Sequence, residues 1–115
     1  MVPANPEWRY VPVRRTAIFI EPIQGDSGIV VPPQPFIDRL VEISRQHGIL
    51  IVAEEVQTGI GRTGEWFASE HFGLQPDILL SSKALASGLP LSAIIARADL
   101  MDSWSPPGHV FSTGG

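Results

Sequence analysis

The 115 residues of the chain, 43% of them hydrophobic at a mean hydropathy of +0.13, supply enough apolar side chains for a packed core and argue against disorder. A net charge of -4 with scattered basic residues argues against a nucleic-acid partner, and the absence of cysteine and the wide spacing of the three histidines argue against a metal site. No apolar run approaches the roughly 18 residues of a membrane-spanning helix and the start carries no signal pattern, so we expect a cytoplasmic protein that does not bind a membrane.

The first half of the chain predicts a strand, a helix and a second strand. Residues 1–16 are rich in proline and show no periodicity, so we expect an irregular lead-in there. The apolar run at 17–20 precedes turn residues, which indicates a parallel strand buried on both faces. Apolar residues three and four apart between 36 and 46 predict an amphipathic helix that Gly48 ends. The apolar run at 49–53 completes a strand, helix and strand crossover unit.

The second half continues the same alternation. A glycine-rich loop at 58–64 leads to a predicted short helix at 66–71, and its glycine spacing fits no nucleotide-binding fingerprint. An apolar run at 78–80 predicts a third strand, 91–96 a fourth, and 100–102 a single helical turn. The sequence therefore predicts an α/β fold with a mostly parallel sheet and crossover helices.

Polar side chains follow each of the first three predicted strands. Glu21 follows the first, Glu54 and Glu55 end the second, and Lys83 follows the third. Ligands of parallel sheets bind beyond the carboxyl ends of the strands, so we expect these groups to meet at one edge. A lysine beside a buried strand and small residues is poorly solvated, which favours the neutral amine that attacks an aldehyde. The alternative is an ordinary solvated lysine at the surface.

Several stretches together resemble the signature motifs of the class III pyridoxal-phosphate-dependent aminotransferases, the family that acts on 4-aminobutyrate, ornithine and acetylornithine. The matching stretches are Glu54 to Gly64, Glu70 to Asp77 followed by Lys83, Glu21 to Gly25, and Gly88 to Ala93. They lie in the family's order and at its spacing. The resemblance covers the chain from Ala17 to the last residue.

The resemblance implies the fold, cofactor and partners. Residues 17–115 would form part of the large, cofactor-binding domain of fold-type I (aspartate aminotransferase-like) enzymes. The cofactor would be pyridoxal 5'-phosphate, and the partners an amino donor, a 2-oxo acid acceptor and a second copy of the chain in a homodimer. The terminal Gly114 and Gly115 open an element that nothing closes, so we expect a chain truncated at both ends and poorly active alone.

The resemblance also implies roles for individual residues. Lys83 would be the Schiff-base lysine and then the acid and base that moves a proton at the substrate. Gln57 would donate to the phenolic oxygen of the cofactor ring, and Val56 would pack on the ring face. Glu54 stands where the family has an aspartate that pairs with the ring nitrogen, which keeps the charge and adds a methylene. Glu55 would be structural, paired with an arginine or a backbone amide.

Three further residues receive roles from the same resemblance. Glu21 would lie on the substrate side and pair with an arginine from further along the family's sequence. Ser112 and Thr113 fall where a family hydroxyl reaches the cofactor phosphate of the neighbouring subunit, with a register ambiguous by one residue. Paired hydroxyls before two glycines also suit an anion-binding turn, whereas the alternative is a capped turn.

Three functions remain open from the sequence. The first is transamination between an amine or amino acid and a 2-oxo acid, and the second is an amino-acid racemase or epimerase of the same family, which the motifs around Asp26 and Lys83 also resemble. The third is a catalytically inactive truncated fragment, which the Glu54 substitution favours. The central expectation is geometric: the Lys83 amine enters a pocket lined by Gln57 and the Glu54 carboxylate.

Overall fold

The computed structural model describes residues 17–102. Its elements in chain order are strand β1 (Ala17–Ile20), helix α1 (Gln34–His47), strand β2 (Leu50–Glu54), the 3₁₀ helix η2 (Ala68–Phe72), strand β3 (Ile78–Ser81), the 3₁₀ helix η3 (Lys83–Leu85), strand β4 (Ala93–Ala96) and helix α2 (Ala98–Met101). The predicted lead-in at 1–16, and both Ser112 and Thr113, lie outside these residues. Within 17–102, no helix is long and apolar enough to cross a bilayer.

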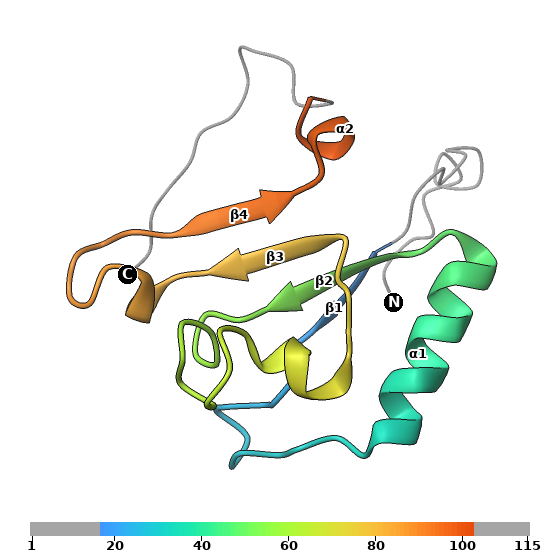
Figure 1. The fold of residues 1–115 in the computed structure, drawn as a ribbon, viewed down its shortest axis with the longest axis horizontal. Helices are drawn as coiled ribbons and strands as arrows, with labels where there is room; N and C mark the ends of the chain where they lie inside the picture. Colours follow the sequence, from blue (N-terminus) through green and yellow to red (C-terminus); the bar gives the residue numbers. More distant parts are fainter. Residues whose placement is uncertain (1–16, 103–115) are drawn as a thin grey trace, which may run out of the picture.

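The four strands form one sheet in the order β1-β2-β3-β4 (Figure 1). Strands β1, β2 and β3 are parallel, whereas β4 runs antiparallel to β3. The predicted mostly parallel α/β arrangement is therefore confirmed. Helix α1 makes the crossover from β1 to β2, but the connection from β2 to β3 passes through a loop and the short η2.

Helix α1 forms because its apolar residues lie on one side and both of its ends carry suitable residues. Pro35 occupies the first turn, where a missing backbone N–H costs nothing, and Gly48 ends the helix in the left-handed conformation at φ 64°. Ile37, only 1% exposed, packs with Ile51 of β2 and Leu74 to make the core. The prediction of this helix and of its last residue is confirmed.

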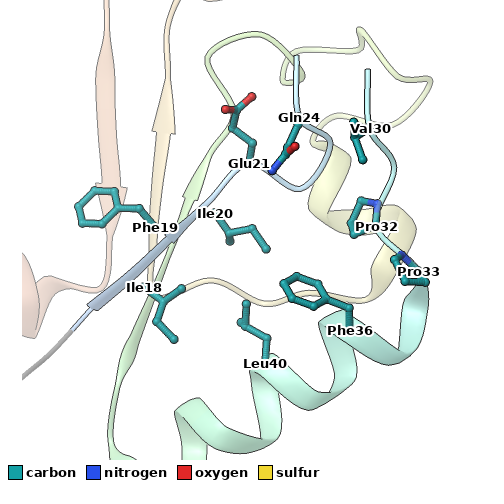
Figure 2. Close-up of a pocket in the computed structure, with 10 residues that line it drawn as sticks. All are labelled: Ile18, Phe19, Ile20, Glu21, Gln24, Val30, Pro32, Pro33, Phe36 and Leu40. Atoms are coloured by element: carbon teal, nitrogen blue, oxygen red, sulfur yellow. The ribbon is translucent and has the colours of Figure 1, made fainter. Parts of the chain in front are cut away.

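Strand β1 differs from its prediction. It pairs with β2 only and forms one edge of the described sheet. Ile18 and Ile20 point toward Phe36 and Leu40 of the helix side, whereas Phe19 points the other way and is 70% exposed (Figure 2). The expectation that β1 is buried on both faces is wrong for the described residues, because only its α1 side is covered. Strand β2, flanked by two strands, is buried as predicted.

Asp77 fixes the relative positions of three strands at the edge where β3 begins. Its Oδ2 accepts from the Ile51 amide at 2.9 Å, and its own amide donates to the Ile51 carbonyl at 2.9 Å. Its Oδ1 accepts from Nη1 of Arg97, just past β4, at 3.0 Å. The hydrogen bond to Asp99 and the charge of Asp99, followed by the charge of Asp77, raise the pKa of Arg97 above its ordinary value. These contacts of Asp77 lie at the opposite end of the sheet from the candidate site.

Candidate functional site

The carboxyl ends of β1, β2 and β3 meet at one edge of the sheet, because the three strands are parallel neighbours. Glu21 follows β1, Glu54 ends β2, and Lys83 comes two residues after β3. Strand β4 is antiparallel, so the residues that precede it, near Leu91, reach the same edge. The sheet therefore brings two carboxylates and one amine to one edge, as the sequence predicted.

The carboxylate of Glu55 anchors the loop that follows β2. Its side chain is fully buried and accepts hydrogen bonds from the Thr58 hydroxyl, the Ala68 amide at 3.0 Å and the Ser69 amide at 2.8 Å. These two amides open η2, whose first N–H groups have no partner within the helix. The predicted structural role through backbone amides is confirmed, and the predicted arginine is not a partner of Glu55 in the described structure.

The carboxylate of Glu54 turns back onto its own loop. Its Oε1 accepts from the Val56 amide at 2.9 Å, and the side chain is partly buried. The second carboxylate oxygen has no such backbone partner among the contacts of residues 17–102.

The amide of Gln57 is held from the β1 side of the site. Its Nε2 donates to Oδ1 of Asp26 at 2.7 Å. A side-chain carbon at Gly25 would lie 2.7 Å from the Gln57 Oε1, so the amide rests directly on the backbone of that glycine. Glu21 in turn accepts from the Gly25 amide at 2.9 Å through Oε2. The sequence shows Gly25 and Asp26 only as turn residues, and no spacing signal reveals their contact with Gln57.

Lys83 stands on the other side of β2 from Asp26. It begins η3 with a left-handed backbone at φ 43°, a conformation that non-glycine residues adopt rarely because it costs conformational energy. Such strained backbone conformations are found often in functional sites. The preceding Ser82 donates its hydroxyl to the Leu91 carbonyl at 3.0 Å, which fixes the turn. Lys83 is the only lysine in the sequence.

The Lys83 side chain is exposed, so the expectation of a poorly solvated lysine is wrong for the described residues. It lines a cavity of about 510 Å³ together with Arg62, Ser82, Ala84, Ser87, Gly88 and Leu89. Glu54 and Gln57 are not lining residues of this cavity, so it is not the shared pocket that the sequence predicted. The physical reason is the sheet order: Gln57 is drawn toward the loop after β1, whereas Lys83 lies past β3.

The size and the basic side chains of the Lys83 cavity suit a small anionic ligand. The Lys83 cavity has the volume of ordinary small-molecule sites and carries two cationic side chains, those of Lys83 and Arg62. No cluster of His, Asp and Glu within 17–102 has the arrangement of a metal site.

A second cavity, also of about 510 Å³, lies between β1 and α1 (Figure 2). Apolar side chains, among them Ile18, Ile20 and Phe36, make up most of its lining. Glu21 reaches its rim, but its carboxylate is engaged with Gly25. This apolar cavity offers no reactive group and is separate from the cavity of Lys83.

Comparison with known proteins gives a consistent family. The family model for class-III aminotransferases matches residues 14–115. The chain is 55% identical to a leucine/methionine racemase of Thermococcus litoralis over 84% of this chain and 22% of that protein. It is 45% identical to a probable 4-aminobutyrate aminotransferase of Bacillus subtilis over 77% of this chain and 20% of that protein.

The fold is also similar to a solved structure of the ornithine aminotransferase from Toxoplasma gondii. The TM-score is 0.78 at 44% identity, over 84% of this chain and 23% of that one. That structure is described as having pyridoxal phosphate at partial occupancy in its active site. The mostly parallel sheet is thus that of the aminotransferases, and the chain spans about a fifth to a quarter of the length of these proteins.

Replacing the buried Glu55 should loosen the loop that carries Gln57. In Glu55→Gln, one carboxylate oxygen becomes an NH₂ group that faces N–H donors, so at least one buried donor loses its acceptor. We expect the free energy of unfolding to fall by about 1–3 kcal/mol, measured by urea denaturation. The control Glu65→Gln changes an exposed glutamate of the same loop and should stay within about 0.5 kcal/mol. Equal effects of the two substitutions would contradict the anchoring role of Glu55.

Proposed function

The chain belongs to the class III aminotransferase family, and on this premise we propose that it supplies the cofactor-bonding lysine of a pyridoxal-phosphate-dependent transaminase. The reaction transfers an amino group from an amine or amino acid to a 2-oxo acid. The observation that carries the proposal is the position of Lys83. The only amine-bearing side chain of the sequence emerges from a strained backbone into a cavity at the carboxyl edge of a parallel sheet.

The chemistry divides between the cofactor and the protein. Pyridoxal 5'-phosphate, when bound, supplies an aldehyde and a ring that withdraws electrons from the substrate α-carbon. The Lys83 Nζ would hold the aldehyde carbon in the resting protein. Once displaced by the substrate amine, the same Nζ would accept the α-proton and return it, which places general base and acid on one atom.

The other residues would orient the ring. The free N–H of Gln57 would donate to the phenolic oxygen, and Val56 would pack on the ring face. Glu54, with one oxygen engaged by the Val56 amide, would offer the other to the ring nitrogen. The hydroxyls of Ser112 or Thr113 would contact the phosphate of a neighbouring subunit. Glu21 would act on the substrate side through the loop that it braces.

A racemase is the second candidate. The identity to the Thermococcus litoralis racemase is 55%, against 45% for the Bacillus subtilis aminotransferase, over similar shares of the chain. Both reactions need one lysine that moves the α-proton, so the same residues serve either. We also propose that the protein is cytoplasmic and works as a homodimer, in keeping with the family resemblance. The third possibility, an inactive segment, is an outcome of the tests below.

The lysine assignment predicts a single covalent adduct. Mixing the full chain with pyridoxal 5'-phosphate and reducing with borohydride should attach one cofactor to the peptide that contains Lys83, detected by peptide mass spectrometry. The reason is that Lys83 is the only lysine, so the N-terminal amine is the sole competitor. Lys83→Arg keeps the positive charge and should abolish that adduct. Labelling of the N-terminal peptide alone in the parent chain would contradict the proposal.

The transaminase and racemase candidates differ in what they need for turnover. We expect a transaminase, loaded with pyridoxal 5'-phosphate, to convert L-leucine to its oxo acid catalytically only when 2-oxoglutarate is added as acceptor. A racemase would form D-leucine from L-leucine with no acceptor. Chiral chromatography of the amino acid and assay of the oxo acid separate the two. Turnover of neither kind, in a chain that carries the Lys83 adduct, would favour the inactive segment.

A further inference from the structure

We propose that Asp26 is a positioning residue for Gln57, and that the loop from Glu21 to Val30 sets the direction of its side-chain amide. This inference rests on the proposed function for its consequence at the cofactor ring. Its geometric part concerns only residues of this chain. Asp26 touches neither Lys83 nor the cavity that Lys83 lines, so it would act through Gln57.

The hydrogen bond between the two side chains decides which way the amide faces. Nε2 of Gln57 lies 2.7 Å from Oδ1 of Asp26, a short distance for a bond to a carboxylate. A carboxylate accepts and does not donate, so the nitrogen end of the amide must face Asp26. One of the two N–H groups is thereby used. The other N–H is left to donate, in a direction that the first bond defines.

The backbone of Gly25 supplies the second constraint. A Cβ at this residue would lie 2.7 Å from Oε1, 2.9 Å from Cδ and 3.2 Å from Nε2 of Gln57. Any side chain at position 25 would therefore displace the amide. Because the displaced atoms are the end of a flexible side chain, this displacement would cost the fold little. Gly25 thus forms a wall against which the amide lies.

The loop is itself braced, so it can impose this direction. Glu21 accepts from the Gly25 amide at 2.9 Å. Gln24 and Val30 exchange two backbone hydrogen bonds of 3.0 and 3.1 Å, which close the loop. The partners of the Asp26–Gln57 bond are 31 residues apart and follow different strands. A pre-oriented amide loses less conformational entropy when it meets a ring oxygen than a freely rotating one.

The direct test observes Gln57 without any cofactor. In the full chain, ¹⁵N–¹H spectra should show that Asp26→Ala shifts the side-chain amide resonances of Gln57 and narrows the difference between its two protons. Asp26→Asn retains an acceptor oxygen and should restore much of that difference. Gly25→Ala should reproduce the effect of Asp26→Ala by displacing the amide. Ser27→Ala, an exposed neighbour in the same loop, is the matched control and should leave the resonances in place.

The second measurement is the binding of the cofactor to the variants. Asp26→Ala should weaken the binding of pyridoxal 5'-phosphate about two- to tenfold and move the pH at which its absorbance changes. In a Gln57→Ala background the same substitution should do neither, because the coupling runs through the amide. Unchanged Gln57 resonances in Asp26→Ala, or an undiminished effect without Gln57, would overturn the inference. If the chain binds no cofactor, the proposed function fails, and the amide spectra alone decide the role of Asp26.

Discussion

The buried carboxylate of Glu55 is the contact on which the edge of the sheet depends. It joins Glu55, the residue directly after β2, to the first two amides of η2, across a loop that contains three glycines besides the Val56–Gln57 pair. Gly59 approaches so closely that a Cβ there would lie 2.7 Å from the Glu55 carbonyl. A fully buried carboxylate with three donors and a glycine packed on its backbone leaves this loop little freedom. This arrangement fixes the backbone position of Gln57 within the loop.

The candidate site is spread over three strands, and each of its parts is held from a different side. Gln57 is braced by the loop after β1, through Asp26 and Gly25. Lys83 is braced from the β4 side, because Ser82 donates to Leu91. Between them, Glu54 caps its own turn. A cofactor at this edge that contacted both Gln57 and Lys83 would therefore join two separately supported groups. Its binding would depend on the distance between them, which the spacing of the strands sets.

The sequence correctly predicted the elements that depend on residues close together in the chain. The spacing of apolar residues and Gly48 located α1, and the apolar run of β2 indicated a buried strand. Burial of β1 was predicted wrongly, since a short apolar run does not reveal whether a strand lies at an edge. The contact between Asp26 and Gln57 and the left-handed backbone of Lys83 were also beyond reach, because they depend on how distant loops meet. Motif resemblance predicted that Lys83 shares a pocket with Gln57 and Glu54, whereas in the structure Gln57 is held from the β1 side and Lys83 lines a separate cavity past β3.

The most direct measurement of the central claim is a crystal structure of the chain after reaction with pyridoxal 5'-phosphate and borohydride. The account predicts continuous density from Nζ of Lys83 to the cofactor, with the ring reaching across the end of β2 to the amide of Gln57. The Gln57 amide should still face Asp26. A cofactor attached elsewhere, or a ring that leaves Lys83 on the side away from Gln57, would contradict it.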